Sequence, residues 1–225
     1  MSINVVEKID DLIFIKHVLI SVSDKTDLDR FIPRLIKINP KIVIFSTGGT
    51  FERLKEIMGD NGSGQLIQVS DYTGQPETQG GLVKTLDFKI YLGLLTETYN
   101  DLHKKDLERT KSVPIDMTVV NLYPFKETIS KKNITPENAR GNIDIGGPCM
   151  IRASAKNFLR VAAVVNPLDY EAVADELEKN RGKITLKLRY RLAQKAFKHT
   201  ADYDCMISEY LNNTLYSDVK TCYNF

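Results

Sequence analysis

KIVIFSTGGTFERLKEI, residues 41–57, runs from an apolar strand pattern through a Gly-Gly turn into a helical pattern. Residues 41–47 are apolar and rich in β-branched side chains, and apolar residues recur at helical spacing over 50–57. The preceding segment has the same order, with a strand pattern at 17–23 and a helical pattern at 28–38. Two successive strand–turn–helix units predict βαβ architecture and a parallel sheet.

Three more apolar runs extend the predicted sheet. They lie at residues 64–69, 115–125 and 161–167. Strands this uniformly apolar are typical of a sheet covered on both faces. Helical patterns follow at 167–180 and at 186–213, the second compatible with one break, and the remaining tail shows no clear element. We predict a single α/β domain, a parallel central sheet with helices on both faces, and a helical C-terminal segment.

Composition excludes several classes of protein. A net charge of +2 gives no indication of nucleic acid or an acidic membrane as a partner. Acidic residues precede the first apolar run, unlike a secretory signal, and no apolar run approaches the ~20 residues of a membrane helix. The three cysteines are odd in number and scattered, so we expect a reducing, cytoplasmic location and no metal site.

Two turns rich in small residues, SVSDKT (21–26) and STGGT (46–50), each lie between a predicted strand and a helix. Free N–H groups at a helix N-terminus attract an anion, and glycines let a phosphate approach closely. Both turns are expected at the carboxyl ends of neighbouring strands, where open α/β sheets bind ligands. The pair indicates a phosphate site; the alternative, that Asp24 and Thr50 only cap their helices, stays open.

Two later segments carry further candidate residues. NLYPF (121–125) places Asn121 and Tyr123 at a strand end, where ligands bind, but on this motif alone a tyrosine packed at a sheet edge is the better explanation. In NIDIGGPCMIRASAKN (142–157), Asp144 lies between two isoleucines. Partial desolvation there would raise its pKa unless donors surround it. Asp144 is therefore either a helix cap or a ligand-binding or catalytic acid.

Six motifs occur in the order seen in one enzyme family: SVSDKT, STGGT, VKTL, NLYPF, IDIGGP and AKN. KAFKHTADYD (195–204) also looks like the closing helix of that family. The chain thus resembles the IMP cyclohydrolase domain, the N-terminal half of a bifunctional purine-biosynthesis enzyme that also carries AICAR transformylase. The match implies a domain over 17–211, an N-terminal extension at 1–16, a C-terminal tail at 212–225, and an absent transformylase domain.

The resemblance implies a methylglyoxal-synthase-like α/β fold. It implies that the substrate is the formylated aminoimidazole carboxamide ribonucleotide, FAICAR, and that the products are IMP and water. It implies no metal or organic cofactor, no nucleic-acid or membrane partner, and a homodimer. Because the transformylase half has no counterpart, a separate transformylase chain is expected to supply FAICAR, unless this chain has another role.

The resemblance also assigns site residues. The residues expected to bind the nucleotide, with the 5′-phosphate at the second turn, are Ser23, Asp24, Lys25, Thr26, Thr47, Gly48, Gly49, Thr50, Thr85, Asn121, Ile145 and Gly146. The residues expected to be catalytic are Lys84, Tyr123, Asp144 and Lys156. In this hypothesis Asp144 helps a proton leave the carboxamide and Lys156 is an acid/base, while Lys84 and Tyr123 stabilise the formyl oxygen.

Residues 81–93 depart from the family, reading GLVKTLDFKIYLG where GRVKTLHPKIHGG is usual. Lys84 and Thr85 are kept, but five family residues are replaced, by Leu82, Asp87, Phe88, Tyr91 and Leu92. Loss of the arginine removes a forked donor. Asp87 adds a negative charge that is expected to pair with Lys84 or Lys89 and to alter the pKa of Lys84.

Two alternatives to a cyclohydrolase stay open. The first is a catalytically impaired, cyclohydrolase-like domain that binds a purine nucleotide as a regulator or partner, supported by the altered segment 82–92. The second is methylglyoxal synthase, which shares the fold and the phosphate site. NLYPF and IDIGGP match the cyclohydrolase family and argue against methylglyoxal synthase. Activity on dihydroxyacetone phosphate would support methylglyoxal synthase again.

Overall fold

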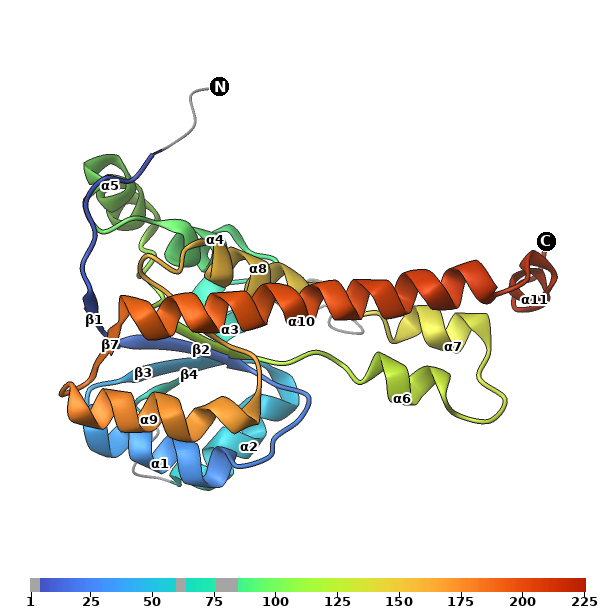
Figure 1. The fold of residues 1–225 in the computed structure, drawn as a ribbon, viewed down its shortest axis with the longest axis horizontal. Helices are drawn as coiled ribbons and strands as arrows, with labels where there is room; N and C mark the ends of the chain where they lie inside the picture. The colour runs from blue at the N-terminus through green and yellow to red at the C-terminus, as the bar shows by residue number, and fades with distance from the viewer. Residues whose placement is uncertain (1–4, 60–63, 76–84) are drawn as a thin grey trace.

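The computed structural model describes residues 5–59, 64–75 and 85–225, and it shows a parallel sheet between two layers of helices (Figure 1). Its five strands are β2 (His17–Ser21), β3 (Val43–Ser46), β4 (Leu66–Gln68), β5 (Met117–Val120) and β6 (Ala162–Val164). They lie in the order β4-β3-β2-β5-β6, and each neighbouring pair is parallel. The predicted α/β fold is confirmed.

Helices cover both faces of the sheet because successive strand residues point to opposite sides. In β2, Val18 and Ile20 pack with one helix layer and Leu19 packs with the other, and all three are fully buried. The first layer contains α1 (Leu28–Ile38), α2 (Gly48–Met58) and α9 (Tyr170–Lys179). The second layer contains α3 (Val69–Thr73), α4 (Phe88–Leu95) and α8 (Gly146–Lys156).

The direction of winding changes between β2 and β5. From β2 the chain passes outward to β3 and β4, and it then returns to add β5 and β6 on the other side. The segments that leave β2 and β5 therefore diverge at the carboxyl ends of two adjacent strands. Such a switch point leaves a crevice that open α/β sheets use for ligands.

The C-terminal half differs from expectation in two places. Residues 186–213 form one unbroken helix, α10 (Leu186–Asn213), since the segment contains no glycine or proline. The tail, for which no element was expected, contains α11 (Tyr216–Thr221). Helix α10 packs along α8 and β6, and its far end extends beside α6 (Phe125–Ile129) and α7 (Pro136–Gly141), as Figure 1 shows. Among the described helices, none has the length and apolar character of a membrane span.

The N-terminal segment packs onto the domain. Strand β1 (Leu12–Phe14) pairs antiparallel with β7 (Lys183–Thr185), and Ile13 and Ile15 are buried in the core. The domain bounds at 17 and 211 stay a prediction, but residues 12–15 contribute to the same core as β2.

Arg189, at the start of α10, holds this region together. Its side chain is fully buried and donates five hydrogen bonds of 2.7–3.0 Å. The acceptors are the backbone carbonyls of Asp10, Asp11, Phe158, Leu159 and Ile184. All five guanidinium donors are used, although desolvation still lowers the pKa of Arg189 to about 10.

We expect Arg189→Met to lower the free energy of unfolding by more than about 3 kcal/mol, because five carbonyls lose a charged donor. Urea unfolding followed by circular dichroism measures this. Arg191→Met, at an exposed position of the same helix, is the matched control and should change stability by less than about 0.5 kcal/mol. Equal stability of the two variants would contradict the role of Arg189.

Candidate active site

A cavity of about 380 Å³ lies at the carboxyl ends of β2, β3 and β5. This is within the ~300–1,000 Å³ typical of small-molecule sites. The structure brings most predicted site residues into its wall: Ser23, Lys25, Thr47, Gly48, Gly49, Thr50, Thr85, Asn121, Tyr123, Asp144, Ile145 and Gly146. Sequence reasoning missed the other wall residues, which are Ser21, Val22, Leu86, Val120, Gly141, Ile143, Gly147 and Met150.

Hydroxyl groups join the two small-residue turns. Thr50 is 4% exposed, and its Oγ1 accepts from the N–H of Val22 at 3.0 Å and donates to the Val22 carbonyl at 2.9 Å. The hydroxyls of Ser21 and Thr47 lie 3.3 Å apart. Thr50 therefore does not cap α2, whose N-cap is Thr47; it fixes α2 against the turn that follows β2.

Asn121 fixes the same turn from the end of β5. Its Oδ1 accepts from the N–H groups of Ser23 at 2.7 Å and Asp24 at 2.9 Å, and its Nδ2 donates to the Asp24 carbonyl at 2.9 Å. The side chain lines the cavity, but these three bonds give it a structural role that the sequence did not predict. It sets the shape of the turn across the switch point.

Asp24 and Thr26 interact with each other. The Asp24 carboxylate accepts from the Thr26 hydroxyl at 2.6 Å and from the Thr26 N–H at 2.9 Å, and these bonds lower its pKa. Asp24 does not cap α1, because the N-cap position belongs to Asp27. Neither Asp24 nor Thr26 belongs to the cavity wall formed by the described residues, whereas Lys25 does. Their assignment to nucleotide binding stays a prediction.

The N-terminus of α2 gives the cavity the features of an anion site. The helical hydrogen bonds begin at Thr50, so the N–H groups of Gly48 and Gly49 precede them. Gly48 has a φ of 48°, in the left-handed region that favours glycine. A Cβ added at Gly49 would meet nothing within 4 Å. Backbone donors, a helix dipole and open space therefore coincide, with the Lys25 ammonium nearby.

Asp144 stands at the N-terminus of the second helix that reaches the cavity. Its Oδ1 accepts from the N–H of Gly147 at 2.9 Å, so the carboxylate satisfies a donor in the first turn of α8, although the N-cap position itself is Ile145. A side chain at Gly147 would come within 2.5 Å of Asp144 Oδ2 and of Leu122, so only glycine permits this approach. Similarly, a Cβ at Gly146 would lie 2.8 Å from Thr85 Oγ1. The Gly-Gly pair lets the carboxylate and Thr85 close around the helix start.

Burial raises the pKa of Asp144, and the backbone N–H groups of Gly147 and Tyr123 oppose the rise only in part. The two explanations of this residue, helix cap and functional acid, thus both describe it. A half-buried carboxyl with a raised pKa in a cavity wall is characteristic of a functional group. The Tyr123 side chain is 56% exposed beside it, so its hydroxyl is accessible to a ligand.

Two predicted catalytic lysines are not placed in the cavity. Lys84 lies outside the described residues. Lys156 is exposed at the last position of α8, ten residues beyond Gly146, which is about 15 Å along the helix. As far as the described residues define the wall, Lys156 is not part of it.

The altered segment after Lys84 has a structural explanation. Asp87 is 3% exposed and is the N-cap of α4, where it accepts from the backbone N–H of Lys89 at 2.7 Å. The Lys89 ammonium donates instead to the Tyr72 carbonyl at 3.0 Å, so the expected charge pair between Asp87 and Lys89 is wrong. The hydroxyl of Tyr91 is buried next to Cys149, and desolvation raises its pKa.

Two family models match the chain. The model described as an MGS-like domain matches residues 27–149, more than half of the sequence. The chain belongs to the MGS-like domain family. A second model, described as the AICARFT/IMPCHase bienzyme, matches residues 154–224 of this MGS-like protein.

Curated relatives agree with both models. The bifunctional purine biosynthesis protein PurH of Ruminiclostridium cellulolyticum is 46% identical over 202 residues, and that of Bacillus subtilis is 45% identical over 201 residues. Each alignment covers 89% of the MGS-like protein and 38% of the relative, so the chain spans about two fifths of the length of these proteins. The crystal structure of ForH superposes with a TM-score of 0.76 at 27% identity, over 88% of this chain and 97% of that one. The resemblance to the IMP cyclohydrolase domain is confirmed.

We expect Gly49→Ala to weaken the binding of inorganic phosphate, measured by calorimetry, at least about ten-fold, because the added methyl group would occupy the open space at the cavity wall that an anion needs. The fold should be unchanged. Gly64→Ala also adds a methyl group in open space but lies outside the wall, and it is the control. An unchanged Kd in Gly49→Ala would argue against an anion site at α2.

Asp144 should also lower stability at neutral pH. Its folded-state pKa is raised above 3.8, so between 3.8 and that pKa the folded protein binds more protons than the unfolded chain. Stability therefore falls as pH rises through this window, and the loss is complete above the folded pKa.

We accordingly expect Asp144→Asn to raise Tm at pH 7.5 by about 2 °C, with a gain that shrinks as the pH approaches 4. Differential scanning calorimetry across this pH range measures it. Asp204→Asn removes an exposed carboxylate of α10 and should show no such dependence. A gain independent of pH would contradict the assignment of the effect to Asp144 ionisation.

Proposed function

We propose that the protein is an IMP cyclohydrolase that closes the purine ring of FAICAR to give IMP and water, the last step of de novo purine biosynthesis. The observation that carries the proposal is the composition of one cavity. Backbone donors of α2 and the charge of Lys25 provide for a phosphate, while Asp144 and Tyr123 provide acid/base and donor groups. The similarity to PurH supports the same reaction.

The reaction needs little beyond positioning and proton transfer. The carboxamide nitrogen attacks the formyl carbon of the same molecule, and a C–N bond forms. The carboxamide nitrogen and the formamide nitrogen each lose one proton. The C–O bond then breaks, a C=N bond forms to the formamide nitrogen, and the formyl oxygen departs with the two protons as water. A cavity that anchors the phosphate and folds the two groups together supplies much of the rate. Because burial raises the pKa of Asp144, its carboxylate is a stronger base than an exposed aspartate and is suited to taking the proton of the carboxamide nitrogen.

Tyr123 and the remaining predicted residues complete the proposal. The exposed Tyr123 hydroxyl would donate to the formyl oxygen as negative charge develops there. Lys84 is proposed for the same oxygen on the family resemblance alone. Thr85, Ile145 and Gly146 lie together in the cavity wall beside Asp144. They are proposed to contact the imidazole or purine ring of the nucleotide.

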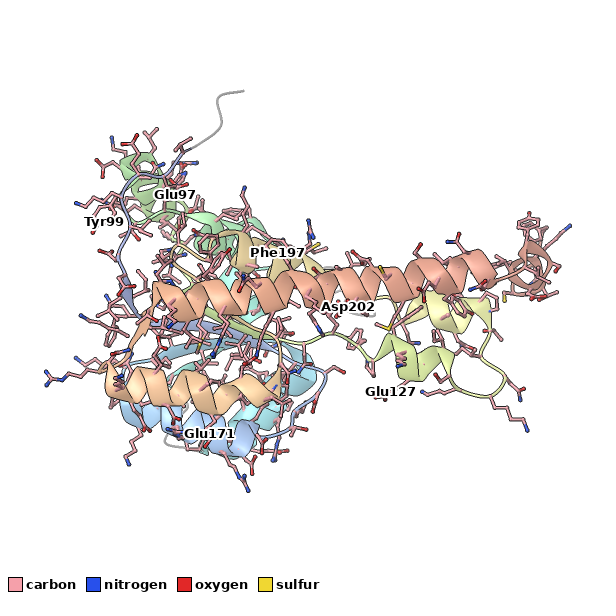
Figure 2. All side chains as sticks on the ribbon, viewed as in Figure 1. Glu97, Tyr99, Glu127, Glu171, Phe197 and Asp202 are labelled. Carbon is pink, nitrogen blue, oxygen red and sulfur yellow. The ribbon has the colours of Figure 1, made fainter. Side chains whose placement is uncertain are left out.

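A homodimer is proposed as the working form. Large apolar side chains are exposed on α4 and α10, with Phe88 at 59%, Leu95 at 38% and Phe197 at 39%, the last labelled in Figure 2. Helix α8 packs against both helices. Because Lys156 lies at the exposed end of α8, an acid/base role would require it to act at the cavity of a neighbouring chain. A cytoplasmic location is proposed from the three scattered cysteines, and a domain over 17–211 is proposed on the resemblance alone.

A second candidate is a domain that binds a purine nucleotide without turnover. The structural observation in its favour concerns Asp87 and Tyr91, which replace family histidines. Both side chains pack within the protein and do not line the cavity formed by the described residues. Asp87 caps α4, and the Tyr91 hydroxyl is buried. In this candidate the nucleotide site is kept and the groups that follow Lys84 no longer assist chemistry.

The purified chain should convert FAICAR to IMP, followed by absorbance, and Asp144→Asn should lower kcat at least about 100-fold. In the wild type, kcat should rise with pH through the raised pKa of Asp144, because the ionised form is the base. Asp101→Asn removes a carboxylate that is 84% exposed on α5 (Asp101–Thr110) and serves as the control. Absent IMP formation, combined with tight IMP binding by calorimetry, would replace the cyclohydrolase with the second candidate.

A further inference from the structure

Tyr203 contacts the backbone of Asp144 from a distant part of the chain. It follows Asp202, which Figure 2 labels on α10. Its hydroxyl oxygen accepts a hydrogen bond from the Asp144 N–H at 2.8 Å, across 59 residues of sequence. This is the bond that joins the long C-terminal helix to the candidate base.

The Tyr203 ring is held rigidly. The residue is 3% exposed and belongs to the core on the α8 side of the sheet. The ring of Phe125 packs edge-on against it, with centroids 6.1 Å apart and planes at 69°. Helix α10 itself packs along α8 and α6, so the hydroxyl is presented to Asp144 from a fixed position.

Asp144 occupies the short connection between α7 and α8. The hydrogen bond to Tyr203 fixes the N–H of Asp144, while the N–H groups of Gly147, at 2.9 Å, and of Tyr123 hold its carboxylate. Together they determine where the carboxylate points within the cavity wall. Tyr203 is not in the wall defined by the described residues, so it can act on a bound ligand only through Asp144.

We propose that Tyr203 is a positioning residue for Asp144, holding the carboxylate in the orientation that proton transfer requires. This inference rests on the proposed function. Any buried tyrosine hydroxyl needs a hydrogen-bond partner, and this requirement concerns stability only. The partner of Tyr203 is the N–H of Asp144, the proposed base, so the same bond also sets the position of that residue. A small displacement of a reacting group is enough to reduce turnover strongly.

The test compares Tyr203→Phe with Tyr210→Phe. Tyr210 is on the same helix and packs edge-on against the same Phe125, with centroids 5.9 Å apart, but among the described residues its hydroxyl makes no hydrogen bond to Asp144. We expect Tyr203→Phe to lower kcat for FAICAR about 10- to 100-fold while KM changes by less than about two-fold. Tyr210→Phe should retain wild-type kcat and KM.

A second measurement separates this inference from the proposed function. Amide hydrogen exchange of residues 142–147 in the unliganded protein should become about ten-fold faster in Tyr203→Phe only. Equal kcat in the two variants would overturn the inference. If the wild type forms no IMP, the proposed function fails, and faster exchange confined to Tyr203→Phe then supports the positioning of Asp144, whereas equal exchange overturns it.

Discussion

The three hydrogen bonds of the Asn121 side chain are the constraint on which the candidate site depends. They join the end of β5 to the turn after β2, across the point where the winding of the sheet reverses. Thr50 joins the same turn to α2 from the other side. The turn is therefore bound to the end of β5 and to α2 before any ligand is present. A phosphate site built on backbone N–H groups needs this order, because its donors cannot be reoriented without moving the chain.

Buried charges occur both in the framework and in the site. Arg189 donates to five carbonyls. Arg160, 6% exposed, bonds to Asp116 at 3.0 Å and to two backbone carbonyls. Desolvation nevertheless lowers the pKa of both guanidinium groups, that of Arg189 to about 10. At Asp144 desolvation raises the pKa, which lowers stability at neutral pH but makes the carboxylate a stronger base, as a group in the cavity wall requires.

The sequence predicted the sheet and most of the cavity wall because both follow from local patterns. Apolar runs identify buried strands, and small residues between strand and helix identify turns at one sheet edge. It did not predict that Asn121, Thr50 and Asp87 would bind backbone groups. Such bonds depend on which segments meet in space, and the residue type alone is equally compatible with binding a ligand. Tyr203 was missed for the same reason, since its partner is 59 residues away.

Helix α10 connects the framework to the site. Arg189 in its first turn binds the carbonyls of residues 10 and 11, and Tyr203 lies fourteen residues later, about 21 Å along the helix. The helix between them has no glycine or proline, and α10 packs against both α8 and β6. One continuous helix therefore carries the residue that binds the N-terminal segment and the residue that binds the N–H of Asp144.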